Sequence, residues 1–490
     1  MRLTTLSLLA LTTILVIPET VLAGGFTQTT FGSRRNGMHA NLGNPDDLTA
    51  LFHNPAGLAY QPGIRVHLSA SLALTEQSIQ MKAHDQQRFP EIYKNCDGGD
   101  WTSPSCDYPV GKDGYYLDSI EPEKAIGGLP YIGLSTDLSF LGPGGRDFVV
   151  AMAITAPLFM GAYLPEEAPT AYNLIGGYFL VLSTTVGVAW KAHPKFSLGG
   201  SISYNHMRIS LGQKLSVVDA LTPKGGTPDA LATFAQNTLG DIMMDYSGVD
   251  HGVGWALGIL AQPIKGFRVG LAYSGAMHAY FEGPVTFTGQ SENAKKDPSL
   301  LPSALAMAGY KLPTGLEIEI PIPHNIQGGI NIQLSPHLEV GFDVRLWLYN
   351  LIEKQKLVPV YDPSAPGKEP LTEEGLTRDK DFNLSYQIGG GLMFRPFGHD
   401  DRLQIMFGIG YDHSPTPGKS FTLDNAASTH TKISLGLRWR MFDRWRMSAT
   451  YFINLLQPLN IQHSQTNPQT NVRATGLSHS PGLEVEYVYD

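Results

Sequence analysis

The chain has 490 residues, a length that would usually correspond to several soluble domains, and its formal charge of −9 gives no basic surface for binding a nucleic acid. Its mean hydropathy is −0.09, and beyond the leader no run reaches the roughly 18 apolar residues that a spanning helix requires. The 53 glycines and 10% aromatic residues fit a large β-barrel, in which polar residues facing the lumen dilute the apolar residues facing lipid.

Residues 1–23 have the pattern of a cleavable signal peptide. Arg2 gives the positive start, 3–17 form the apolar core, and small residues at 21–23 form the cleavage site. The alternative is a signal anchor, but the apolar core is short for a membrane span. We therefore expect an exported protein.

The segment 24–62 precedes the first long strand and is predicted to form a plug, or hatch, inside a barrel that occupies 63–490. It carries Asn54-Pro55-Ala56-Gly57. Pro55 fixes its own φ and moves Asn54 out of the α region, while Gly57 permits a sharp reversal. Alone, such a sequence indicates a surface turn. A compact segment that precedes a barrel in the sequence is expected to lie inside the barrel lumen.

The two cysteines, Cys96 and Cys106, lie in one polar loop. In an exported protein they are expected to form a local disulfide. A pair of metal thiolates is the alternative, although no histidine or third cysteine is close in sequence. We expect no metal and no cofactor.

Beyond residue 62 the chain alternates apolar and polar residues with the period of two that marks β-strands. In 337–350, for example, Leu338 and Val340 fall on one face and Glu339 and Asp343 on the other. About fourteen runs are long enough to cross the apolar layer at a tilt. They lie near 63–76, 126–138, 147–158, 176–192, 195–211, 251–263, 266–283, 318–335, 337–353, 382–396, 401–413, 430–442, 444–457 and 481–489.

The connections between these runs alternate between short and long. Short turns such as 193–194 and 335–336 alternate with long ones such as 77–125 and 212–250. Short periplasmic turns and long extracellular loops are typical of outer-membrane barrels. The sequence therefore predicts an all-β, antiparallel transmembrane barrel of about 14 strands in the outer membrane of a Gram-negative cell.

Two long loops carry helical patterns, at 227–244 and 297–310. One interpretation is that these helices pack on each other and on the barrel rim. The other is that their apolar faces line a groove where a hydrophobic ligand first binds. The groove residues would be Phe234, Leu239, Met243, Leu301, Leu305 and Tyr310.

The chain resembles the FadL family of outer-membrane transporters for long-chain fatty acids and other hydrophobic compounds. The resemblance extends over nearly the whole mature chain. It is carried by the order of several short motifs: Gly25-Phe26, NPAGLA at 54–59, AITAPLFMGAYLP at 153–165, GWALGILAQPIKGFRVGLAYS at 254–274, FEG at 281–283, PIPHNIQGGINIQLSP at 321–336 and YDHSPTP at 411–417.

The resemblance implies a barrel closed by an N-terminal hatch, with ligand capture between two extracellular loops. It also implies lateral exit through a gap at a kink in the third strand, near the hatch Asn-Pro-Ala. Pro157 has no N–H to donate and fits a position where strand pairing is broken, and Gly161 follows it. Asn54, Pro55, Ala56 and Gly57 are predicted to fill that gap.

The chain departs from the family pattern in two places. It ends in Asp490 after Tyr489 rather than in an aromatic residue. It also carries Gln387 before Gly389, where relatives often have arginine, so a carboxylate ligand would lose a charged partner. Other polar residues are candidates for lining the lumen and contacting the ligand: His206, Arg208, Arg345 and Arg438. The ordinary charged lining of a barrel is the alternative interpretation.

We therefore predict a monomeric, non-enzymatic transporter for passive uptake of long-chain fatty acids, in contact with lipopolysaccharide. Neutral aromatic or aliphatic hydrocarbons are the alternative ligands. A lipid hydrolase would need a nucleophile and a base, and no G-x-S-x-G or H-E-x-x-H motif is present. A porin for polar solutes and a structural or adhesive surface protein are further alternatives.

Overall fold

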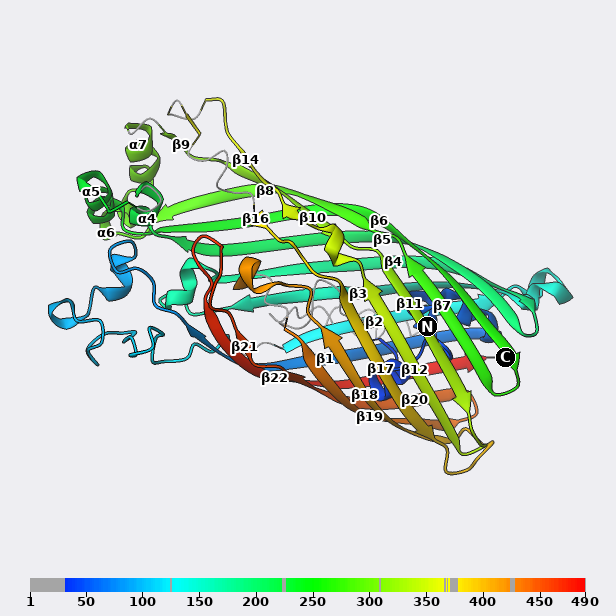
Figure 1. Ribbon diagram of the computed structural model, residues 1–490. Helices are drawn as coiled ribbons and strands as arrows, with labels where there is room; N and C mark the ends of the chain where they lie inside the picture. Colours follow the sequence, from blue (N-terminus) through cyan, green and yellow to red (C-terminus); the bar gives the residue numbers. More distant parts are fainter. Residues whose placement is uncertain are drawn as a thin grey trace, which may run out of the picture.

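The protein is described by a computed structural model that covers residues 31–123, 126–222, 226–307, 310–364, 367, 369–370, 378–423 and 428–489. One antiparallel sheet closes on itself into a barrel (Figure 1). Its first strand, β1, pairs with its last, β22, from Ile64 opposite Tyr489 to Met81 opposite Val472. The predicted signal peptide lies outside the described residues, as does Asp490.

The wall is built from eighteen strand segments. They are β1 (Ile64–Met81), β2 (Ile126–Asp137), β3 (Phe148–Tyr163), β4 (Gly176–His193), β5 (Phe196–Leu215), β6 (Ile242–Ile264), β7 (Phe267–Ser274), β8 (Met277–Gly289), β10 (Gly315–Ile322), β11 (Asn325–Gln333), β12 (Leu338–Trp347), β14 (Leu357–Val360), β17 (Ser385–Phe394), β18 (Leu403–His413), β19 (His430–Phe442), β20 (Trp445–Leu456), β21 (Leu459–Asn460) and β22 (Val472–Tyr489). Because β8, β11, β14 and β21 continue earlier segments across interruptions, the described wall has 14 strands, which confirms the predicted barrel.

The remaining elements are short. The helices are α2 (Ser33–Met38), α3 (Ala50–His53), η1 (Pro55–Tyr60), η2 (Pro90–Tyr93), η3 (Asp97–Gly99), η4 (Ser139–Leu141), η5 (Pro143–Asp147), η6 (Pro169–Tyr172), α4 (Val217–Leu221), α5 (Ala230–Leu239), α6 (Glu292–Lys296), α7 (Leu300–Met307), η7 (Tyr349–Leu351) and η8 (Gly418–Ser420). Two small loop sheets pair β13 (Lys354–Gln355) with β16 (Arg378–Asp379), and β9 (Tyr310–Lys311) with β15 (Glu369–Pro370). Within the part of the chain described, no helix is long and apolar enough to span a membrane.

The strands expose apolar residues on the outside and bury polar residues on the inside. On β18 the outward Phe407 and Ile409 are 45% and 56% exposed, whereas the inward Gln404 and Asp412 are buried. This is the reverse of a soluble sandwich, and it suits a wall whose outer face meets lipid. Period-two alternation on a closed sheet is sufficient to place apolar side chains outside and polar side chains inside.

Several strands are longer than predicted, most of all β6 and β22. β6 begins at Ile242 rather than 251, and β22 begins at Val472 rather than 481. Helix α5 ends at Leu239 because Gly240 takes a φ of 66°, so the helix predicted over 227–244 stops before Met243. The apolar residues after Leu239 therefore belong to strand β6. In the sequence, their spacing fits a helix and a strand equally well.

The two ends of the barrel differ. The end of β22 and the short turns between strands lie at one end, on the right of Figure 1, which we call the lower end. Helices α4 to α7 and the long loops lie at the other, upper end. Residues 31–61, called the plug below, lie inside the lower half, where α2 contacts β17 to β20 and β22, and η1 contacts β3 to β6.

Candidate functional site: the plug and the interrupted wall

Asn54 ties the plug to the barrel wall. Its side chain is fully buried, accepts from the Ala56 N–H at 3.2 Å, and donates to the carbonyl oxygens of Leu42 at 3.3 Å and Ile259 at 3.1 Å. The first contact caps η1, as expected for asparagine before Pro55. The third crosses from the plug to β6.

The predicted position of Asn54-Pro55-Ala56 is wrong. These residues lie against β5, β6 and β7, not against the kink of β3. A Cβ placed on Gly199 would lie 2.4 Å from the Ala56 nitrogen, and one on Gly258 would lie 2.2 Å from Asn54 Oδ1. Inward glycines on adjacent strands therefore let the plug backbone reach the wall. That glycine pattern was visible in the sequence.

The wall between β2 and β3 is interrupted. Their pairing runs from Asp137 opposite Val149 to Tyr131 opposite Thr155 and ends there. The β3–β4 register then shifts between Thr155 and Leu158, which brackets Pro157. Above this point the described residues show no ladder between β2 and β3, and the Glu123 N–H donates to the Tyr163 oxygen at 2.9 Å at the upper end of β3. Gly161 stays in that ladder, where a Cβ would come within 2.5 Å of the Gly177 oxygen.

An apolar cluster at this interruption includes residues of the plug and of the wall. Phe31 of the plug lies 5.5 Å, ring to ring, from Tyr131, the last β2 residue paired with β3. Ala156 and Phe159, on either side of Pro157, belong to the same buried cluster. Leu58 and Ala59 extend η1 into it. Because Phe31, Tyr131 and Phe159 are ordinary apolar positions in the sequence, we did not predict them.

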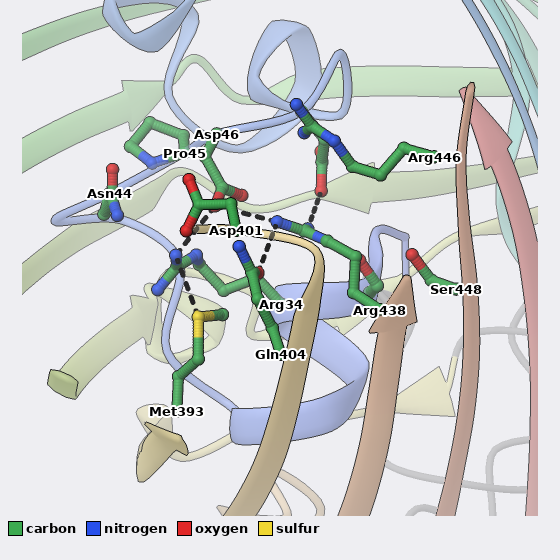
Figure 2. Close-up of polar contacts among 12 residues, drawn as sticks. Arg34, Asn44, Pro45, Asp46, Met393, Asp401, Gln404, Arg438, Arg446 and Ser448 are labelled. Atoms are coloured by element: carbon green, nitrogen blue, oxygen red, sulfur yellow. Dashed lines mark hydrogen bonds and ion pairs between the residues drawn. The ribbon is translucent and has the colours of Figure 1, made fainter. Parts of the chain in front are cut away.

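A buried ion network joins the plug to the opposite wall (Figure 2). Asp46 contacts Arg34 of the plug at 2.7 Å and Arg438 of β19 at 2.8 Å. Arg34 also pairs with Glu339 of β12, which pairs in turn with Arg395. Burial alone would raise the pKa of Asp46, but the two guanidinium groups hold it well below its usual value.

Arg345 and Arg438, two of the residues predicted to line the lumen, contact the plug. Arg438 also donates to Ser33 Oγ at 2.7 Å. Arg345 donates to Asn41 Oδ1 at 2.6 Å, and the neighbouring Asp343 accepts from the Asn41 N–H at 2.7 Å. Removing either partner of such a buried ion pair is energetically costly, because the other charge is left buried without a partner.

Gln387 bridges the plug and the wall in the same manner. It accepts from Arg35 of the plug and donates to Asp412 of β18 at 2.8 Å. A neutral amide can do both, whereas an arginine at this position could not accept from Arg35. Gln387, which departs from the family pattern, is therefore complementary to Arg35 of the plug.

The prediction that His206 and Arg208 line the lumen is wrong. On β5 the inward residues are Asn205, Met207 and Ile209, so the alternating positions 206 and 208 face outward. His206 there contacts His251 of β6 on the exposed surface. Polar residues occur on both faces of this strand, which is why alternation did not identify the lumenal face.

The upper lumen is apolar. Inward residues of the wall, among them Phe179, Val181, Met207, Phe281 and Ile318, belong to one buried cluster. Side chains from the long loops close it from above, including Phe89, Tyr116, Tyr172, Phe382 and Phe421. This lining differs from the water-filled interior of a porin.

Three of the six predicted groove residues meet. Leu239, Leu301 and Leu305 pack in one buried cluster between the loop helices, as in our first interpretation of these helices. Phe234 is 67% exposed and lies outside that cluster. Met243 lies on β6, and Tyr310 lies in the short strand β9. The groove itself stays a prediction.

A disulfide joins Cys96 and Cys106 in the loop between β1 and β2. Among the described residues no group of three His, Cys, Asp or Glu side chains is arranged to hold a metal ion. In the same loop, His84 packs against the rings of Phe89, Tyr116 and Tyr172. Burial lowers the pKa of His84 to about 4.

The closed barrel with an apolar exterior defines the protein as an outer-membrane β-barrel. A sequence profile described as "Outer membrane protein transport protein (OMPP1/FadL/TodX)" matches residues 14–489. The chain therefore belongs to this family of transport proteins and to the outer membrane. A search of curated protein sequences finds no match.

Solved structures share the fold. A Pseudomonas aeruginosa FadL homologue aligns with a TM-score of 0.74 at 15% identity, over 95% of this chain and 100% of that one. The Pseudomonas putida toluene transporter TodX aligns at 0.63 and 13%, over 95% and 100%. The Ralstonia pickettii toluene transporter TbuX aligns at 0.59 and 13%, over 94% and 98%.

Proposed function

We propose that this transporter carries hydrophobic molecules passively from the extracellular loops into the apolar upper lumen and then sideways between β2 and β3. The observation that supports lateral exit best is the end of β2–β3 pairing at Tyr131 opposite Thr155. Unpaired backbone groups in a membrane wall are energetically costly. An interruption of strand pairing between β2 and β3 therefore supports a functional role for this position. The apolar lining removes the ligand from water before it reaches the interruption.

The plug is the proposed gate. Phe31 and Leu58 share a buried cluster with Ala156 and Phe159 at the interruption. A ligand moving from the lumen to the gap would have to displace these side chains. The ion network on the far side of the plug would keep the rest of it in place during that movement, because buried pairs are costly to break.

A neutral apolar ligand is the best-supported substrate. The long-chain fatty acid that we predicted from the family resemblance needs a lumenal cation. His206 and Arg208 face outward, and Arg345 and Arg438 are occupied by plug partners. Gln387 carries no charge. The names of TodX and TbuX as toluene transporters agree with this choice.

Uptake of radiolabelled toluene and of oleate, by cells that lack their own transporter and express this one, tests the substrate. We expect toluene uptake to rise severalfold above the empty vector and oleate uptake to rise less. Oleate uptake equal to or greater than toluene uptake would restore the fatty acid prediction. Swelling of liposomes in sugars at porin-like rates would contradict both.

Pro157→Val tests the exit. Valine restores a backbone N–H where β3 leaves β2, so pairing can extend and uptake should fall severalfold. The matched control is Pro321→Val on β10, which lies in a strand that stays paired with β8. Equal uptake by the two variants would contradict lateral exit at this position.

A further inference from the structure

Among the described residues, four pairs of tyrosine and histidine from neighbouring strands stand on the outer face of the barrel. In three of them the tyrosine hydroxyl meets histidine Nδ1: Tyr204 with His251 at 2.6 Å, Tyr273 with His324 at 2.7 Å, and Tyr451 with His479 at 2.6 Å. In the fourth, Tyr386 stacks on His413 with ring centroids 4.8 Å apart. Each pair bridges two neighbouring strands of the wall.

The pairs lie at the upper border of the apolar band. On β5 the outward residues run upward from Leu198 and Ile202 to Tyr204, His206 and Arg208. The change from aliphatic to aromatic to charged side chains marks the boundary between the hydrocarbon layer and the headgroups. The same order occurs on β11 and β10, where outward isoleucines give way to a histidine and then to glutamates.

The histidines have a ring nitrogen left for a partner outside the protein. The Ala276 N–H donates to His324 Nδ1 at 3.1 Å, so Nδ1 is the acceptor and Nε2 carries the hydrogen in the neutral ring. The tyrosine hydroxyls of the other two hydrogen-bonded pairs likewise occupy Nδ1. A donor at this depth needs an acceptor, because lipid tails supply none.

The patch on β5 and β6, formed by Tyr204, His206, Arg208 and His251, differs from the other pairs. His206 Nδ1 lies 3.5 Å from His251 Nδ1, and Arg208 is the next outward residue on the same strand. Two imidazoles and a guanidinium thus share one exposed surface. Tyr204 is 52% exposed and closes its lower edge.

Acidic residues lie near both this patch and the Tyr273–His324 pair, and the patch also carries the outward guanidinium of Arg208. Glu282 of β8 lies opposite Val249, which lies opposite Arg208, and the Asp250 carboxylate accepts from the Tyr280 N–H at 2.7 Å. On β10, the strand segment above His324, Glu319 lies on the outer face within 3.1 Å of His278, with Glu317 above it.

We propose that the patch of Tyr204, His206, Arg208 and His251 binds a phosphate group of the glycolipid in the outer leaflet. An anionic phosphate accepts several hydrogen bonds and matches guanidinium and imidazole donors. Its depth, at the border of the apolar band, is where a lipid phosphate lies. The residues that sequence analysis assigned to a lumenal carboxylate would then hold an anion on the opposite side of the wall.

Native mass spectrometry of the purified mature protein in detergent, with added bisphosphorylated lipid A, tests this. We expect His206→Gln, Arg208→Gln and His251→Gln together to weaken lipid A binding by about tenfold or more, as for loss of about 1.4 kcal/mol or more. Arg208→Gln alone, at an exposed position, should weaken it in the same direction. His324→Gln, in a separate tyrosine–histidine pair on the outer face, should leave it unchanged.

Three results would overturn the proposal. They are unchanged lipid A binding by the triple variant and by Arg208→Gln, equal binding of lipid A stripped of its phosphates, and displacement of lipid A by millimolar inorganic phosphate, which would indicate a site for free anions. Heat-modifiable migration in SDS gels shows in each case that the barrel has folded.

Discussion

The lower and upper halves of the lumen are lined by different chemistry, although the same strands form both. On β5 the inward residues of the lower half are Ser197, Ser201 and Asn205, whereas those of the upper half include Met207 and Ile209. The lower half holds the plug through ion pairs and hydrogen bonds. The upper half holds apolar side chains from the wall and the loops.

This difference separates two tasks that one lumen must perform. Specific polar contacts keep a plug in one orientation, because each buried charge that loses its partner is costly. Apolar contacts are non-directional and can accept a ligand in many poses. The interruption between β2 and β3 lies beside the plug, where the two halves meet.

The largest effect is expected from removing a charge in the lower half. Arg438→Met leaves Asp46 and Asp47 without a shared partner in a buried site, so the plug should lose about 3–5 kcal/mol of stability. Hydrogen exchange of residues 31–61 measures this, and the barrel should keep its heat-modifiable migration.

The matched control for that variant lies on the same strand. Arg440→Met removes an exposed pair with Asp400 at 3.0 Å and should change plug exchange by less than about 1 kcal/mol. If both variants left plug exchange unchanged, the network would not be what holds the plug.

A polar group in the upper half should have the next largest effect. Ile318→Asn removes a fully buried aliphatic side chain and adds an amide with no partner, at a cost of about 2–4 kcal/mol. Uptake of toluene should fall while exchange of the plug residues stays the same. Faster plug exchange in this variant would show that the two halves are coupled rather than separate.

A smaller effect is expected at the contact between plug and β6. Asn54→Ala removes hydrogen bonds to Leu42, Ala56 and Ile259 and should destabilise η1 by about 1–3 kcal/mol. Exchange should rise in 54–60 and remain slow in α2, which the ion network holds. Uniform acceleration across 31–61 would mean that the plug unfolds as one unit.

The smallest effect is expected in the loops that close the upper half. The pKa of His84 is lowered from 6.5 to about 4, so between these values an open loop takes up a proton that the closed loop does not. Closed-loop stability should therefore fall as pH drops from about 6.5 to about 4, and then level off.

Hydrogen exchange in 84–120, corrected for intrinsic rates, measures that pH dependence, and His84→Gln should flatten it. Asp241, whose pKa burial raises to about 6, acts in the opposite direction, so the variant must be compared with the parent at each pH. An identical slope in both proteins would mean that His84 is not responsible.

The sequence alone determined the barrel. Alternation over runs of ten residues, with short and long connections in turn, was enough to predict 14 strands and the outer membrane, because these follow from local periodicity. It also placed Pro157 in a strand that it disrupts, since proline lacks a backbone donor whatever surrounds it.

The tertiary structure decided which side chains meet. Alternation shows that His206 and Arg208 share a face, but β5 has polar residues on both faces, so only closure of the barrel placed them outside. The register shift around Pro157 moves Leu158 and Met160 to the lumenal side, which no count of residues reveals. Arg438 and Asp46 are separated by 392 positions in the sequence. Contacts over such separations form only after the strands have paired.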